Sequence, residues 1–275
     1  MFSVIKAGMA TAKNELSIIS NNVANANTTG FKKSIAAYTD VAPSSLSDSI
    51  QASSSGLGSL VEANRMIHTQ STLLPTQNTT DFGLAGNGFF ILENPQDAML
   101  SFTRNGSFSI DTDGFLTASD SCRVLGKPLV DGDFATEDVD IDTLLPIQIP
   151  MQKDNEVMSE LIIGEDGKIL AQYGEYSDLT PPTPIGTLVL ALFSNTEGLR
   201  ELGNARYRAT EKAGTLQVGE PMDSGFAAVK TGYLETSNVD ITDELTAMIR
   251  AQQQFNGAAR LMQTNSELLE KLTRS

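Results

Sequence analysis

The chain has 275 residues, of which 40% are hydrophobic, and a formal charge of −15. It is long enough for one or two globular domains and too acidic to bind the phosphate backbone of a nucleic acid. The single cysteine, Cys122, excludes an intrachain disulfide and a cysteine-based zinc site. The single histidine, His68, excludes most histidine-dependent catalysis. No apolar run reaches the ~18–20 residues of a membrane span, so we expect no direct membrane insertion.

The charge is unevenly distributed along the sequence. Residues 1–40 carry four lysines and two acids, and residues 240–275 carry four basic and five acidic groups, which leaves −16 on residues 41–239. Such a strongly acidic middle is solubilising and self-repelling. We therefore expect the near-neutral ends to pack against copies of the chain while the middle faces water.

The N-terminal residues predict a helix over residues 1–26. Its apolar positions alternate in steps of four and three, as in a coiled-coil seam: Ile5, Met9, Ala12, Leu16, Ile19, Val23 and Ala26. Gly30 follows the helix and favours a left-handed exit of the chain.

The C-terminal residues predict a second helix, over about 241–275. Asp240 or Thr242 can cap it, and Asp243 and Glu244 suit the positive end of its dipole. A seam with the same alternation runs through Met248, Ala251, Phe255, Ala258, Met262, Asn265, Leu269 and Leu272, and a second row comprises Leu245, Ile249 and Ala259. Each helix alone could be an ordinary amphipathic helix on a core. Two helices of matching period at opposite ends favour pairing as a coiled-coil-like domain that folds on assembly.

Between the helices the pattern predicts mostly antiparallel β structure, so the expected fold class is α+β. Residues 31–80 read as an extended connector with one strand near 59–67, and residues 81–230 as a β-rich outer domain, with 1–30 and 231–275 as the helical segments. Strands are predicted at 88–92, 161–163, 168–173 and 187–193. Asn105 and Gly106 favour a two-residue hairpin turn, a second turn is predicted at 113–114, and 131–142 reads as a looser acidic stretch.

Candidate chemistry in the middle of the chain is weak. The acidic segments at 111–114 and 131–133 resemble fragments of calcium loops but lack the ligand spacing of an EF-hand. His68 has no strained nucleophile elbow to serve as a partner, and the glycine-rich segments lack a phosphate-loop lysine. We therefore predict no enzyme activity, no metal and no cofactor; a metal-dependent adhesin or hydrolase in the β domain is the alternative from another class.

Three segments together resemble the bacterial flagellar rod and hook protein family. Residues 16–33 read LSIISNNVANANTTGFKK, residues 232–272 read GYLETSNVDITDELTAMIRAQQQFNGAARLMQTNSELLEKL, and the middle contains GNGFF and FTRNGSF. The matching positions include Asn22, Asn25, Gly30, Phe31 and Glu235. Val23 stands where the family has a larger aliphatic residue.

The resemblance implies a structural rod subunit that polymerises into a tubular axial structure in the basal body. Its terminal helices would pair, so we predict an assembly interface of Ile5, Met9, Ala12, Leu16, Ile19, Val23, Asn22, Asn25, Gly30, Phe31, Leu245, Met248, Ile249, Phe255, Met262, Leu269 and Leu272. Expected partners are copies of itself, other flagellar rod and hook subunits and the flagellar export apparatus, which would export the chain without a cleaved Sec signal. A proximal rod subunit, a distal rod subunit, a short hook-type subunit and an unrelated coiled-coil scaffold stay open.

Overall fold

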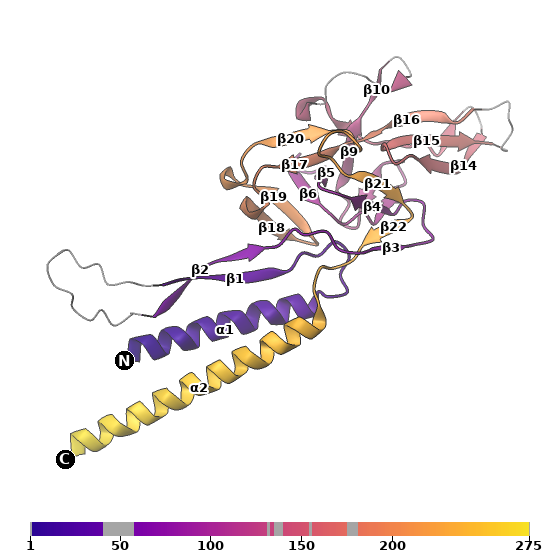
Figure 1. Ribbon diagram of the computed structural model, residues 1–275. Coiled ribbons are helices and arrows are strands. Elements are labelled where there is room, and N and C mark those ends of the chain that lie inside the picture. The colour runs from indigo at the N-terminus through magenta and orange to yellow at the C-terminus, as the bar shows by residue number, and fades with distance from the viewer. Residues whose placement is uncertain are drawn as a thin grey trace. The chain divides into compact units, whose positions relative to one another are not determined.

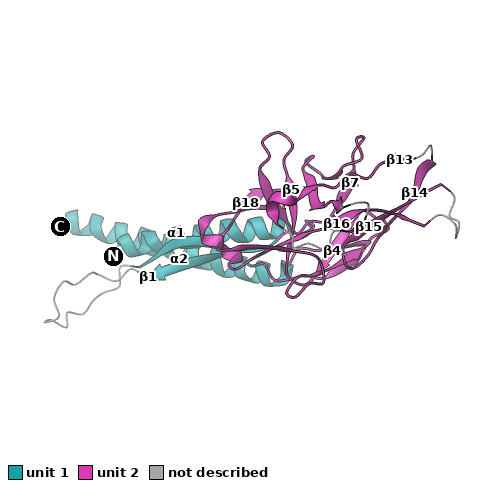
Figure 2. Cartoon of the chain, turned by 90° about the horizontal axis from the view of Figure 1, so that it is seen from above, with its two compact units in different colours: residues 1–26, 32–67, 239–275 teal, residues 27–31, 68–238 magenta. Residues whose placement is uncertain are grey.

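A computed structural model describes residues 2–40, 58–130, 133–134, 140–153, 156–174 and 181–274. The chain divides into two compact units (Figure 2). Unit 1 comprises residues 1–26, 32–67 and 239–275, and unit 2 comprises residues 27–31 and 68–238. The α+β class with a mostly antiparallel β domain is confirmed, whereas the four domain boundaries expected from the sequence stay predictions.

Unit 1 holds both helices and one hairpin. Helix α1 (Phe2–Ala24) and helix α2 (Ile241–Arg274) lie side by side and run in opposite directions (Figure 1). Strands β1 (Ser34–Asp40) and β2 (Ser59–Met66) pair antiparallel and contact α1. The strand expected near 59–67 is confirmed as β2, but the sequence analysis did not identify β1.

The helix ends agree with the capping signals in the sequence. The Asp240 Oδ1 oxygen accepts hydrogen bonds from the backbone N–H groups of Thr242 (2.8 Å) and Asp243 (3.3 Å), so Asp240 is the N-cap of α2. Gly30 lies just after α1 with a φ of 69°. A Cβ there would come within 2.6 Å of the Asn105 backbone nitrogen, so both the conformation and the space require glycine.

Unit 2 is built on a large antiparallel sheet. Its main path runs β13 (Gln152–Lys153), β14 (Glu156–Ile163), β15 (Lys168–Tyr173), β16 (Thr183–Leu188), β9 (Arg123–Lys127), β5 (Phe89–Glu93), β6 (Leu100–Thr103), β19 (Arg206–Ala209) and β18 (Leu199–Gly203). Five strands lie off this path. β8 (Leu116–Ala118) and β12 (Leu145–Pro146) pair with β9, and β17 (Leu190–Phe193) pairs with β5. β7 (Phe108–Ile110) pairs with β8, and β20 (Leu216–Gly219) pairs with β17.

Three small ribbons and three short helices complete unit 2. The ribbons pair β3 (Leu73–Pro75) with β22 (Tyr233–Glu235), β4 (Phe82–Ala85) with β21 (Ala228–Thr231), and β10 (Leu129–Val130) with β11 (Asp133–Phe134). The 3-10 helices are η1 (Ile141–Thr143), η2 (Thr196–Gly198) and η3 (Glu211–Ala213). The core gathers apolar side chains from many strands, among them Phe82, Phe90, Leu92, Phe108, Leu116, Ile169, Leu188 and Leu190.

Several local predictions for unit 2 are confirmed. Strand β5 contains residues 89–92 of the segment expected at 88–92, and β14 and β15 pair across residues 164–167. The turn at Gly114 joins β7 to β8, with the Gly114 N–H donating to the Asp111 carbonyl at 2.9 Å. Part of the acidic stretch at 131–142, including Asp131, lies outside the described residues.

The hairpin predicted at Asn105 and Gly106 is wrong. Strand β6 pairs with β5 and β19, while β7 pairs with β8. The backbone at Gly106 instead lies against β4, since the Phe82 N–H donates to the Gly106 carbonyl at 3.0 Å. The pairing of β6 with β19, about 100 residues later in the chain, outweighed the favourable turn sequence at Asn105 and Gly106.

The single strand predicted over 187–193 is also wrong. The segment is buried, as expected, but it forms two strands that are interrupted at Val189. Strand β16 pairs with β15 and β9, whereas β17 pairs with β5 and β20. The chain changes pairing partners at Val189, and a continuous run of mostly buried apolar residues does not reveal such a change in a sequence pattern.

Candidate assembly surface and the buried junction

The predicted seam of α1 is covered within unit 1. Ala12 and Ile19 are buried, and the other five predicted seam positions are half-buried: Ile5, Met9, Leu16, Val23 and Ala26. Thr11 and Ile18 are also buried, although they lie off the seam. The β1–β2 hairpin explains this second face, because the Tyr38 hydroxyl donates to the Thr11 carbonyl at 3.4 Å.

The predicted seam of α2 is covered over only part of its length. Ala251 is buried, and Met248, Phe255 and Met262 are half-buried. Ala258 and Asn265 are half-buried as well, whereas Leu269 and Leu272 are 46% and 73% exposed, and Leu245 and Ile249 of the second row are exposed too. Helix α2 has 34 residues against 23 in α1, and its C-terminal part runs on beyond the N-terminal end of α1 (Figure 1).

Asn22 connects three elements of unit 1. Its side-chain nitrogen donates to the Ser34 carbonyl (2.8 Å) and to the Glu244 carboxylate (3.2 Å), and its side-chain oxygen accepts from the Ser34 N–H at 3.0 Å. Asn22 and Glu244 are both buried. An amide supplies the donor and the acceptor that this position needs. Asn25, also predicted at the interface, directly follows α1, and its side-chain nitrogen donates to the Asn21 carbonyl at 2.9 Å.

Gly30 and Phe31 lie in unit 2, within a group of three segments that we call the junction: residues 27–31, 68–72 and 235–238. The Gly30 N–H donates to the Glu235 carbonyl at 2.8 Å, and the Asn238 N–H donates to the Phe31 carbonyl at 3.4 Å. The Ser71 N–H donates to the Glu235 Oε1 oxygen at 2.8 Å. Backbone and side-chain bonds therefore join all three segments.

A buried ion pair connects the junction to the rest of unit 2. Arg104 Nη1 lies 3.4 Å from Glu235 Oε2, and the two side chains are 3% and 0% exposed. Burial lowers the pKa of the Arg104 guanidinium, an effect that the Glu235 carboxylate opposes. Arg104 also lies over the Phe89 ring, with its Cζ 5.3 Å from the ring centroid. The sequence analysis did not identify this pair, because its members are 131 residues apart.

His68, the candidate for catalysis, packs among aromatic rings in unit 2. Its ring lies edge-on to Tyr207 and Phe89, at centroid distances of 5.1 and 5.5 Å. No group of three or more His, Cys, Asp or Glu side chains in the described part of the chain could hold a metal ion. Across the same residues, neither helix is long and apolar enough to cross a membrane.

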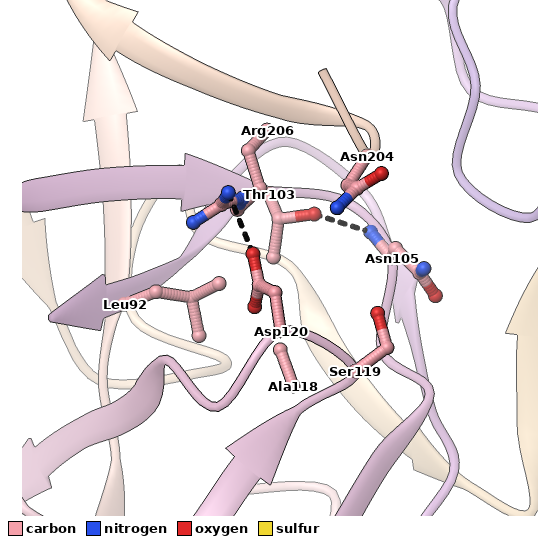
Figure 3. A pocket seen from close by; sticks show the side chains of 8 residues that line it. All are labelled: Leu92, Thr103, Asn105, Ala118, Ser119, Asp120, Asn204 and Arg206. Carbon is pink, nitrogen blue, oxygen red and sulfur yellow. Dashed lines mark hydrogen bonds and ion pairs between the residues drawn. The ribbon is translucent and has the colours of Figure 1, made fainter. Parts of the chain in front are cut away.

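A small pocket lies near Cys122 in unit 2. It is lined by Leu92, Thr103, Asn105, Ala118, Ser119, Asp120, Asn204 and Arg206 (Figure 3). Arg206 and Asp120 form an ion pair of 2.6 Å across it, and the Thr103 hydroxyl accepts from the Asn105 N–H at 3.0 Å. With its charges already paired and room for about one water molecule, the pocket is too small for an organic ligand.

Cys122 is expected to react slowly with alkylating agents. Cys122 is 3% exposed, and burial, followed by the nearby Asp120 carboxylate, raises the pKa of its thiol. A raised pKa leaves less of the reactive thiolate at pH 8. We expect iodoacetamide to modify the native protein at least roughly tenfold more slowly than the guanidinium-unfolded chain, with half-maximal rate at a higher pH. Equal rates in the two states, followed by mass spectrometry, would contradict this.

Comparison with known proteins identifies three regions of this chain. Residues 6–32 match the family model for flagella basal body rod proteins, residues 83–171 that for the flagellar hook protein FlgE/F/G D1 domain, and residues 230–275 that for the flagellar basal body rod FlgEFG protein C-terminal region. The chain is 31% identical to the flagellar basal-body rod protein FlgG of Bacillus subtilis, with 97% of this chain and 95% of that protein covered. The chain belongs to the flagellar basal-body rod FlgG family. 

Other relatives agree with this FlgG assignment. The FlgG protein of Agrobacterium fabrum is 30% identical, again with 97% of this chain and 95% of the relative covered. The flagellar hook protein FlgE of Borreliella burgdorferi is only 21% identical over 98% of this chain. The three matched regions contain the three motifs in which the sequence resembled the rod and hook family, so that resemblance is confirmed and narrowed to FlgG.

Proposed function

We propose that this structural subunit of the flagellar basal-body rod assembles through α1 and α2, which pack as a coiled-coil-like element against copies of itself and other axial subunits. The observation that carries the proposal is the uncovered apolar row on α2. Leu261, Leu268 and Leu272 are spaced by seven and four residues, which places them on one helix face. They are 61%, 55% and 73% exposed.

The energetics support a role for this row in assembly. Fully burying a leucine contributes about 1.5–3 kcal/mol, so a neighbouring subunit that covers these half-exposed side chains would gain about 1 kcal/mol or more from each. Exposed apolar surface of this kind marks interaction sites. Residues 41–239 carry the acidic charge, and we propose that they keep unassembled subunits apart.

Replacing the three leucines with glutamine is expected to prevent rod assembly without unfolding the subunit. The side chains are already exposed in the single chain, so their loss costs the fold little. A matched control, Gln263→Ala/Glu267→Ala/Glu270→Ala, changes exposed positions on the opposite face of the same turns. Each variant is expressed in cells that lack the native protein, and the measurements are the motility of these cells and the presence of rods in their isolated basal bodies. Normal rods with the leucine variant would refute the proposal.

Passage through the flagellar export apparatus is part of the same proposal. The α1 seam begins at Ile5, and its side chain is already half-buried. An assembly helix that starts there must be retained in the rod. Sequencing the N-terminus of the protein from isolated rods tests this, and a start near residue 20 would show that α1 is not an assembly element.

We assign no catalytic residue and no cofactor to this rod subunit. His68 contacts Phe89 and Tyr207 and therefore has a packing role. Gly30 and Phe31 belong to the junction, so we propose that they act by shaping the chain's exit from α1 and not by touching neighbouring subunits.

A further inference from the structure

The chain passes between the two units four times, after residues 26, 31, 67 and 238. All four passages adjoin the three segments of the junction. Two further hydrogen bonds join residues 68–72 to residues 235–238. The Thr236 N–H donates to the Thr72 carbonyl at 3.0 Å, and the Ser71 hydroxyl donates to the Ser237 carbonyl at 2.8 Å. Segments far apart in sequence therefore meet where the chain leaves α1 and enters α2.

Glu235 bonds both of the other segments. Its carbonyl accepts from Gly30, and its carboxylate accepts from Ser71 on one oxygen and pairs with Arg104 on the other. Arg104 directly follows strand β6 and packs on Phe89, so the ion pair also joins the junction to the β core. The carboxylate is fully buried, and a buried charge is stable only when its partners stay in place.

The junction affects how often α1 and α2 meet, because it shortens the chain that connects them. Helix α1 ends at Ala24, three residues before Asn27, and α2 begins at Ile241, three residues after Asn238. Two helices joined only through a long chain meet rarely, since their effective concentration falls as roughly the −3/2 power of the connecting length. Joining residues 27–31 to 235–238 shortens the effective connection to a few residues.

We propose that Glu235, held by Arg104, is a positioning residue for the α1–α2 pair: it keeps the segments leading out of α1 and into α2 together, so the helices form one assembly element before another subunit binds. The inference rests on the proposed assembly role of these helices. It assigns to the buried ion pair a task beyond stabilising the β domain.

Spin-label distances in the purified monomer test this. With Cys122 replaced by Ala, labels on Ser20→Cys and Gln253→Cys occupy exposed positions of α1 and α2. We expect a narrow distance distribution in this parent protein. Glu235→Gln leaves Arg104 buried without its counter-charge, and we expect the distribution to broaden by roughly twofold or more as the connection lengthens.

Glu220→Gln is the matched control. Glu220 pairs with Lys127 at 2.8 Å in the same unit but lies outside the three junction segments. The control removes the same kind of charge and is expected to leave the helix distance unchanged. Equal broadening in both variants would overturn the proposal, since the effect would then be general destabilisation. A broad distribution in the parent, or a narrow one in Glu235→Gln, would also overturn it.

The double variant Arg104→Met/Glu235→Leu decides the matter if Glu235→Gln fails to fold. It leaves no unpaired charge buried, so the β domain is expected to fold, yet it removes the acceptor for Ser71. A folded double variant with a narrow distribution would overturn the proposal, and broadening would support it. These measurements use monomers, whereas the leucine variants test rod assembly, so either idea can fail without the other.

Discussion

Phe255→Asp is expected to abolish rod assembly while unit 2 stays folded. Phe255 is a half-buried seam position of α2 between the covered Ala251 and Ala258. Replacing the ring forfeits about 1.5–3 kcal/mol of burial, and an unpaired carboxylate in the seam adds a penalty of several kcal/mol. Helix pairs of this size have little stability to spare, so the pairing of α1 with α2 should be lost.

The matched control is Gln254→Asp, at the adjacent exposed position, which should assemble normally. Leu16→Asp changes the seam from the α1 side and should give the same result as Phe255→Asp. Circular dichroism of the purified variants measures the loss of helix, and basal bodies from complemented cells measure assembly. Normal rods with Phe255→Asp, or loss of the β fold together with the helix, would contradict the prediction.

Gly106→Ala should destabilise unit 2 more than other glycine substitutions at ordinary φ angles. An added Cβ would overlap the Phe82 carbonyl oxygen and lie 2.8 Å from its carbon. Gly106 does not have a positive φ, so the penalty is steric and not conformational. Because β4 would have to separate from the Gly106 backbone, we expect a loss of about 3 kcal/mol or more.

Thermal unfolding measures this effect. A loss of that size lowers Tm by roughly 6 °C or more in a unit of this length. Gly257→Ala is the control, because nothing lies within 4 Å of the added Cβ in α2 and alanine favours the helix by up to about 1 kcal/mol. An unchanged Tm for Gly106→Ala would mean that β4 does not pack against this backbone as described.

Local patterns predicted the elements of this fold better than their partners. Alternating three- and four-residue steps predicted both helices, and the sequence offered Asp240 or Thr242 as the cap of α2, of which the structure has Asp240. The turn at Gly114 joins strands that are neighbours in sequence, whereas β6 pairs with β19 about 100 residues later. Nothing near Asn105 in the sequence records that β19 competes for the same edge of β6.

In the candidate assembly surface, too, the sequence predicted local features but not contacts between distant residues. The α1 seam was predicted from its spacing, but Thr11 and Ile18 are buried by a hairpin whose first strand was missed. The Arg104–Glu235 pair joins residues that only the tertiary structure brings together. At Leu269 and Leu272 the sequence indicates burial that the single chain does not provide, as expected for side chains that a neighbouring subunit covers.

The base of the β1–β2 hairpin has a consequence for how this family can vary. Ser34 pairs with Met66, and the Ile67 N–H donates to the Lys33 carbonyl at 2.9 Å, so the two ends of the β1–β2 hairpin are joined at its base. Residues inserted or deleted between Asp40 and Ser59 would change the length of the segment between the two strands without shifting the register at this base. A change in the length of this segment would therefore leave the connection from α1 into β1, and from β2 into unit 2, as it is.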